Sequence, residues 1–240
     1  TWAPWVAPNP VPRAVIKGAR TKTTRRQQNH FKARTRSLAP WIPQLAQSVA
    51  AEKHRMQVLL ASAHAVEPGE TFAVDGQQWT RRDHARNVNG KTTYALMTTL
   101  VVDPTGDELN LTHSEHKAFW TWAALEVLRS TGLRIEEVLE LTHLSIRPLR
   151  KQNGEIVPLL QVAPSKTDEE RILPMSPALA KVIRDIISRH HSDHGTVPLL
   201  RRLDRSKREH SQPMPFLFQH HDRSGSGHVF ADSTIRKYLA

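Results

Sequence analysis

The sequence contains no cysteine, which excludes disulfide bonds, cysteine-based zinc sites and thiol nucleophiles. It also contains no apolar run long enough to span a bilayer, so we expect no membrane contact. The opening segment, residues 1–5, lacks the charged head and apolar stretch of a signal peptide and does not begin with methionine. These absences favour a cytoplasmic protein, and they lead us to expect that the sequence is a fragment.

Acidic residues are missing from the first 51 positions, although the whole chain holds 23 of them. All of the charge in this segment is positive, and it supplies most of the formal net charge of +11. A basic segment without acids suits a polyanion such as the DNA backbone. The alternative is a merely solvated tail. The candidate DNA-binding residues here are Arg20, Lys22, Arg25, Arg26, Arg34 and Arg36.

Three segments are expected along the 240 residues. Residues 1–66 combine a proline-rich basic arm with a helix over about 43–65, where apolar residues recur at helical spacing. Residues 67–111 are rich in strand formers and turn residues, which predicts a strand-containing insertion with a basic loop and a strand-like run at 92–102. The third segment comprises residues 112–240. The expected fold class is mainly α with a smaller β part, an α+β arrangement.

A helix is predicted from residue 112, with Thr112 as its N-cap and Glu115 completing a capping box. Thr131 and Gly132 are expected to end it, because glycine supplies the backbone freedom of a tight turn. Arg134 then falls at the start of the next helix, where the helix dipole disfavours a cation. This placement suggests a bound anion nearby. The alternative is an ordinary helix-turn-helix corner with a solvated arginine.

A β-hairpin is predicted after this second helix. Two runs of strand formers, residues 159–163 and 171–174, flank a turn that carries Lys166. The residues before the hairpin, 146–158, are expected to form a loop with a turn at Asn153-Gly154.

The rest of the chain is predicted to contain a helix capped by Ser176, followed by a short strand at 216–218, a Gly/Ser loop at 222–228 and a final helix at 233–239. Between the first helix and the strand lies a hydrophilic stretch, residues 190–212, which contains the densest group among the 14 histidines: His190, His191 and His194. The sequence has no His-Glu-x-x-His pattern and no cysteine partner, so a solvated basic loop is preferred to a zinc site. No metal and no other cofactor are expected.

The pattern Thr-Gly-Leu-Arg-x-x-Glu-x-x-x-Leu from Thr131 to Leu141 resembles the first conserved box of the tyrosine recombinases, the phage integrase family. The lysine-bearing hairpin is the second element of the resemblance, which covers about residues 112–240. The amino-acid sequences of residues 139–143 and 164–171 are similar to those of a group of actinobacterial integrases.

This resemblance implies a recombinase catalytic domain, helical with a small antiparallel hairpin and incomplete at its C-terminus. The arginine of the box, here Arg134, would contact the scissile phosphate, and the acid at Glu137 would support the fold around it. Lys166 would be the catalytic lysine. The implied partner is double-stranded DNA, which would place the protein on the nucleoid. Copies of the protein would associate on DNA in a tetrameric synapse. No metal would be needed. Strand cleavage and rejoining would proceed through a 3′-phosphotyrosyl intermediate.

The second box of the family, His-x-x-Arg followed by the nucleophilic tyrosine, is not matched in its expected context. The only such pattern, His220 to Arg223, falls in a predicted loop and not on a helix. The only tyrosines are Tyr94, which precedes the first box, and Tyr238, which is expected to pack at a helix end. We therefore expect the chain to stop before the second box and to be inactive alone. The alternatives are a non-catalytic DNA-binding module of the same fold and, as a weaker third, a metal-dependent nuclease.

Overall fold

The computed structural model describes residues 33, 36–82, 98–163, 170–204, 209–221 and 226–239. The chain divides into two compact units, Thr1–Gln47 and Ser48–Ala240. In the first unit, η2 (Ala39–Trp41) leads into α2 (Ile42–His64), which confirms the predicted helix and continues into the second unit. Apolar side chains on this stretch, including Leu38, Trp41 and Leu45, are exposed, as is Arg36. None of the described helices combines the length and apolar character that crossing a membrane requires.

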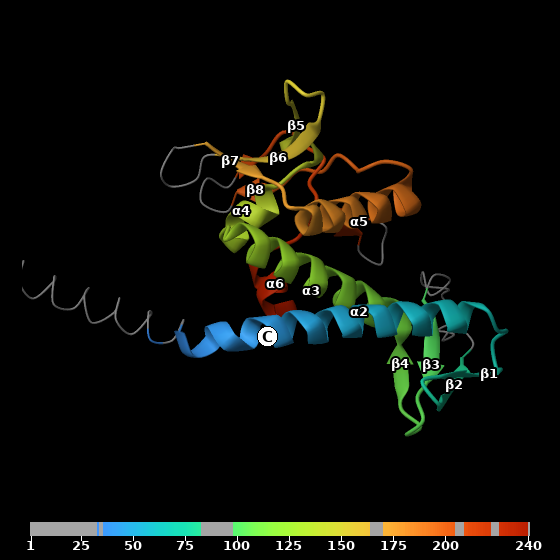
Figure 1. The fold of residues 1–240 in the computed structure, drawn as a ribbon. Helices are drawn as coiled ribbons and strands as arrows, with labels where there is room; N and C mark the ends of the chain where they lie inside the picture. Colours follow the sequence, from blue (N-terminus) through green and yellow to red (C-terminus); the bar gives the residue numbers. More distant parts are fainter. Residues whose placement is uncertain are drawn as a thin grey trace, which may run out of the picture. The chain divides into compact units, whose positions relative to one another are not determined.

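A four-stranded antiparallel sheet follows α2 in the second unit (Figure 1). Its strands pair in chain order: β1 (Thr71–Val74), β2 (Gln77–Arg81), β3 (Leu100–Val102) and β4 (Glu108–Asn110). Asp75 and Gly76 form the β1–β2 turn, and both have the positive φ that a two-residue hairpin turn needs. Phe72 and Trp79 pack against Met56 and Leu59 of α2. The strand-like run at 92–102 is therefore confirmed from residue 100 onward, while residues 83–97 lie outside the described part.

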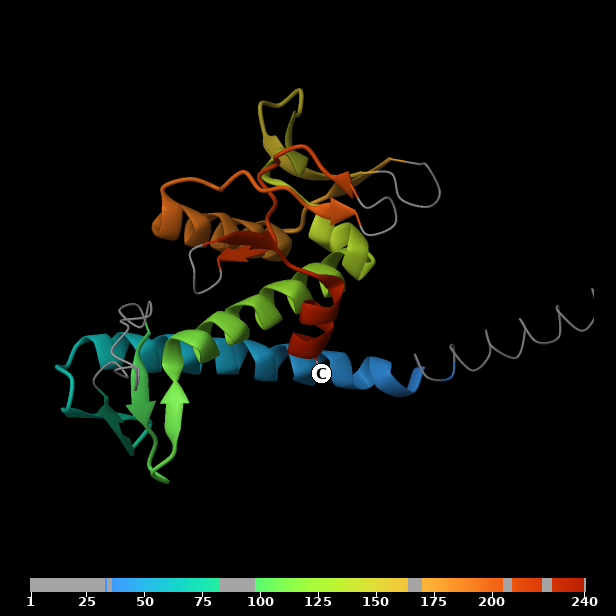
Figure 2. The ribbon, with the colours of Figure 1, turned by 180° about the vertical axis from the view of Figure 1, so that it is seen from behind.

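The helix α3 (Leu111–Thr131) carries the larger hydrophobic core. Trp120 is 2% exposed, and its ring lies 5.1 to 5.7 Å from the rings of Phe119, Phe218 and Phe230. From residue 48 onward α2 contacts α3, as Lys53 over the Trp122 ring shows. The helices α5 (Pro177–His194) and α6 (Asp232–Leu239) also pack on α3 (Figures 1 and 2). This helix therefore joins chain segments that are far apart in sequence.

The start of α3 differs from the prediction. Asn110 is the N-cap, and its side-chain oxygen accepts a hydrogen bond from the His113 N–H at 2.9 Å. Thr112 instead accepts a hydrogen bond from the Thr99 N–H at 2.9 Å. The predicted capping box was wrong because asparagine is at least as strong a cap as threonine, and because Glu115 is used in a buried ion pair.

A second antiparallel sheet contains β5 (Ile146–Arg150), β6 (Ile156–Val162) and β7 (Arg171–Pro174) in that order. The pairing of β6 with β7 confirms the predicted hairpin. The expected loop at 146–158 was wrong, because β5 and β6 form a hairpin that turns at Asn153-Gly154, where Gly154 has φ 82°. Pro148 and Pro158 disfavour strands because they lack an N–H donor, yet they lie opposite each other in register.

Ser176 caps α5 as predicted, and its hydroxyl accepts a hydrogen bond from the Leu179 N–H. The helix is longer than expected and extends through the histidine group to residue 194. His190 is 3% exposed, and its Nε2 lies 2.9 Å from the Leu217 carbonyl oxygen. Burial lowers its pKa. The prediction of a solvated loop was therefore wrong for residues 190–194, since one face of the histidine group is needed for packing.

The remaining short elements are α4 (Ile135–Glu140), η4 (His143–Ser145), β8 (Leu203–Asp204), β9 (Glu209–His210), β10 (Gln219–His221) and β11 (Gly227–Val229). The predicted strand at 216–218 was wrong: Phe216 forms only an isolated bridge with Thr142, and the paired strand begins at Gln219. The expected Gly/Ser loop is partly a strand, since Gly227 and His228 belong to β11. The final helix, α6, is confirmed.

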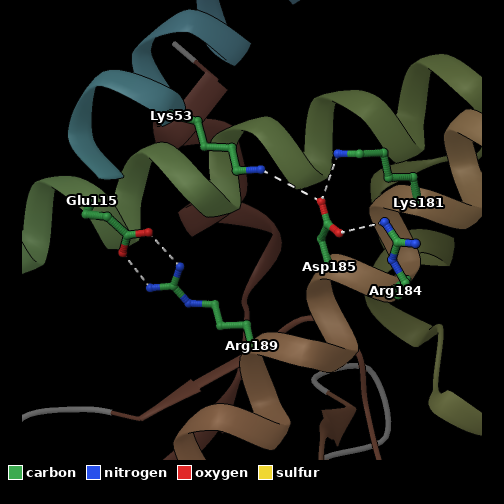
Figure 3. A network of polar contacts seen from close by, with 6 residues as sticks. All are labelled: Lys53, Glu115, Lys181, Arg184, Asp185 and Arg189. Atoms are coloured by element: carbon green, nitrogen blue, oxygen red, sulfur yellow. Dashed lines mark hydrogen bonds and ion pairs between the residues drawn. The ribbon is translucent and has the colours of Figure 1, made fainter. Parts of the chain in front are cut away.

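Charged side chains connect α2, α3 and α5 in the second unit (Figure 3). Asp185 of α5 lies 3.3 Å from Lys181, 3.7 Å from Arg184 and 3.9 Å from Lys53. The Lys53 ammonium also lies 3.5 Å from the centroid of the Trp122 ring, which is a cation–π arrangement. Burial of the Lys53 ammonium lowers its pKa, and the Asp185 carboxylate opposes that shift.

His116 gives this core a dependence on pH. Burial is the largest of the influences that lower its pKa to about 3, with Arg189 and His220 acting in the same direction. The Trp120 indole donates a hydrogen bond to His116 Nε2 at 3.1 Å, which requires that nitrogen to be unprotonated. The neutral imidazole is therefore the form that fits the fold.

We expect acid to destabilise the protein through His116. Because its pKa is depressed on folding, its contribution to stability is complete above pH 6.5 and is lost as the pH falls from 6.5 toward 3. The linkage amounts to at most about 2 kcal/mol between pH 8 and pH 5. Urea unfolding at both pH values should show a smaller difference for His116→Gln, which keeps an acceptor for Trp120, and an unchanged one for His54→Gln, at an exposed position on α2. Equal differences in all three proteins would contradict this assignment.

Candidate functional site

The turn between α3 and α4 places Arg134 at the surface. Gly132 ends α3 with φ 66° and ψ 16°, the left-handed conformation that glycine adopts without strain. Leu133 is buried, and Val138 and Leu139 anchor α4 in the core. Arg134 is the N-cap residue of α4, and its side chain is 63% exposed. The guanidinium group is thus presented to solvent from a rigidly packed corner.

Glu137 holds this corner from the inside. Its Oε2 accepts a hydrogen bond from the Arg134 backbone N–H at 2.9 Å, which satisfies an N-terminal donor of α4. Its Oε1 lies 2.7 Å from Arg171 Nη2 and 3.6 Å from Arg134 Nη1. The carboxylate is nearly inaccessible, at 3% side-chain exposure, and a buried charge of this kind requires such partners. Guanidinium groups fixed in this way offer paired donors to a phosphate or carboxylate.

The β6–β7 hairpin, which includes Lys166, contacts this carboxylate through Arg171. Arg171 is the first residue of β7 and pairs with Val162, the last residue of β6. Lys166 itself lies outside the described residues, so its proximity to Arg134 stays a prediction. Lys166 is five positions from Arg171 in the sequence, and an extended chain covers at most about 17 Å over that length.

Most of the candidate DNA-binding residues in the basic arm also lie outside the described residues. Arg20, Lys22, Arg25, Arg26 and Arg34 lie outside the described residues. Arg36 is described and exposed, in the helical turn before η2. Their contact with DNA remains a prediction.

A second ion pair fixes the far end of α4. Arg202 Nη1 lies 2.6 Å from Glu140 Oε1 and attaches the segment before β8 to this helix. Neither Arg202 nor Arg171 was predicted from the sequence as part of the site. Isolated arginines in strand-like or loop-like segments carry no signal of their own, because the acid that each one meets is distant in sequence.

Tyr238 and the His220 pattern take part in packing. The Tyr238 ring is half-buried on α6 and lies 6.0 Å from the Phe230 ring in an edge-on arrangement. Burial raises the pKa of its phenol. His220 lies on β10, with its ring 4.6 Å from that of Phe230, while Arg223 lies outside the described residues. The interpretation of Tyr238 as a packing residue agrees with these contacts.

No cluster of three or more His, Asp or Glu side chains suited to a metal ion occurs among the described residues. Comparison with models of protein families matches residues 106–238 to the phage integrase family. This match begins at the turn before β4, contains the Arg134 corner and the lysine hairpin, and ends within α6. Comparisons with curated proteins and with solved structures gave no match.

Proposed function

Because the chain belongs to the phage integrase family, we propose that it is the DNA-binding and phosphate-contacting part of a site-specific recombinase. The observation that carries the proposal is Arg134, exposed at a packed corner and held by the buried carboxylate of Glu137. The substrate class is double-stranded DNA. Copies of the chain would associate on DNA, as the tetrameric synapse of the family implies.

Arg134 would stabilise the charge that develops on the scissile phosphate. A guanidinium offers parallel donors to two phosphate oxygens and stays protonated at all physiological pH values. Because Glu137 fixes the backbone of Arg134 as well as its side chain, the donors are positioned before substrate arrives. Preorganised donors of this kind are the main source of electrostatic catalysis.

Lys166 would protonate the 5′ oxygen that leaves when the strand is cut. A lysine on a hairpin turn has a flexible stem, and neighbouring cations lower an ammonium pKa toward the range useful for acid catalysis. The ion pair between Arg171 and Glu137 supports this role, because it fixes the base of the turn beside Arg134. The tyrosine that would form the 3′-phosphotyrosyl link is not assigned.

The second candidate function is that of a DNA-binding module with the same fold and no catalytic activity. The half-buried Tyr238 favours it for the 240 residues taken alone. The test is strand cleavage of a nicked duplex by the full-length product of the gene. A covalent adduct that Arg134→Gln abolishes would support the recombinase, whereas DNA binding without an adduct would support the module.

The basic arm should make DNA binding strongly dependent on salt. Each phosphate that a cation neutralises contributes about −0.9 to the slope of log K against log salt concentration. Deleting residues 1–36 should therefore flatten the slope by up to about eight, as measured by fluorescence anisotropy with a labelled duplex. Replacing the six candidate arginines and lysines of the arm by glutamine, which keeps the chain length, should flatten it by up to about five. An unchanged slope would remove the arm from the DNA interface.

A further inference from the structure

Two arginines share one buried carboxylate at the Arg134 corner. Arg171 Nη2 and Arg134 Nη1 lie 2.7 and 3.6 Å from the same oxygen, Glu137 Oε1. Their guanidinium groups are therefore neighbours, although the residues come from the start of β7 and the N-cap of α4. Both remain accessible, with side chains 46% and 63% exposed, while Glu137 is 3% exposed.

Glu137 is buried at this corner, whereas the two guanidinium groups that it contacts lie at the surface. A guanidinium carries five N–H donors that point in several directions, so it can contact a carboxylate and a phosphate at the same time. The arrangement therefore keeps an exposed cationic surface of fixed geometry above a buried acid, and a tetrahedral dianion or phosphodiester has the size and charge to contact both arginines.

We propose that Arg171 is a second phosphate-binding arginine, held with Arg134 by Glu137 so that both contact the same phosphate of the DNA backbone. The proposal rests on the proposed function for the identity of the ligand as DNA. Its rival is a purely structural role, in which Arg171 only neutralises Glu137. The two roles differ in what happens when Glu137 is made neutral.

The first experiment uses inorganic phosphate and needs no DNA. In the 240-residue chain labelled with ¹⁵N-arginine, titration with phosphate at constant ionic strength should shift the Nε–H signals of Arg134 and Arg171 with one common dissociation constant. Signals would be assigned with Arg134→Lys and Arg171→Lys. Arg184, 69% exposed on α5, is the matched control and should not shift in parallel. A shift of Arg134 without Arg171 would overturn the proposal.

The second experiment uses DNA and the neutral acid. In the Glu137→Gln background no carboxylate requires a partner, so a structural Arg171 becomes dispensable. If Arg171 contacts phosphate, Arg171→Gln in that background should still flatten the salt dependence of duplex binding by about 0.9 in slope. Arg184→Gln in the same background should leave the slope unchanged. An unaltered slope for Arg171→Gln, with thermal unfolding confirming the fold, would show that the structural role is the whole of its function.

The two experiments separate the proposal from its premise. If the chain does not bind the duplex, the function proposed above fails, but the phosphate titration still decides whether Arg171 and Arg134 share an anion. If the chain binds the duplex and Arg171 fails both tests, the DNA-binding function stands and Arg171 is only the counter-ion of Glu137.

Discussion

A nicked suicide duplex, in which loss of a short fragment prevents religation, should form no covalent adduct with the 240-residue chain on a denaturing gel. The physical reason is the state of Tyr238. Its ring packs against Phe230, burial raises the pKa of its phenol, and α6 holds it against α3. A nucleophile must be exposed to the phosphate and activated, whereas this phenol is partly desolvated and harder to deprotonate. Catalytic groups act as a unit, so without an activated nucleophile the cleavage activity should be almost completely absent and not merely reduced.

The contrary result is equally specific. A covalent band that disappears with Tyr238→Phe would make Tyr238 the nucleophile and would require α6 to leave its place on α3 during the reaction. A band that disappears only with Tyr94→Phe would assign the reaction to a tyrosine outside the described residues. A recombinase of known activity, treated with its own suicide substrate on the same gel, provides the positive control.

Replacing Arg189 by alanine should destabilise the protein far more than replacing the exposed Arg184 on the same helix. Arg189 donates to both carboxylate oxygens of Glu115 at 2.8 and 2.6 Å (Figure 3). Its guanidinium carbon lies 4.3 Å from the Phe119 ring centroid. Glu115 is 8% exposed in its side chain, so Arg189→Ala leaves an uncompensated buried charge. We expect a loss of about 3 kcal/mol in the free energy of unfolding. In a chain of this size the melting temperature should fall by roughly 6–12 °C.

The matched control is Arg184→Ala on the same helix. Arg184 is 69% exposed and lies 3.7 Å from Asp185, so its removal should change stability by less than about 0.5 kcal/mol. The double variant Glu115→Leu, Arg189→Met should regain most of the loss, because apolar groups of similar volume can replace a buried ion pair. A double variant as unstable as Arg189→Ala would show that the packing of Arg189 on Phe119, and not the unpaired acid, is the main term.

Much of the helical framework could be predicted because its signals are local. Gly132 at the end of α3 and Ser176 at the start of α5 were predicted from the sequence, and the structure confirms both. The errors arose where two local signals competed. Asn110 and Thr112 are both good caps, and only the strand partner of Thr112, Thr99, decides between them. Pro148 and Pro158 lack the N–H donor of an ordinary strand residue, yet both lie in strands that tertiary pairing forms.

The site was predictable to a different extent. The pattern around Arg134 identified the corner and pointed to Glu137 as its support, and the contacts of Glu137 with the Arg134 backbone and side chain agree with that support. Arg171 could not be recognised, because its role depends on a carboxylate 34 positions earlier and on the register that places Val162 opposite it. The roles of Lys166 and of the arm residues remain predictions.

The position of α6 has a consequence for how the molecule folds. The strand pairs β1–β2, β5–β6 and β6–β7 connect neighbours in sequence and can form early, because they close short loops. Docking of α6 on α3 instead joins residues 117 positions apart, as the contact between Thr121 and Tyr238 shows. The entropic cost of closing a loop rises with the logarithm of its length, so this contact is harder to form first than a hairpin is. We therefore expect α6 to dock late in folding, so that the aromatic cluster around Phe230 is completed only when the far end of the domain arrives.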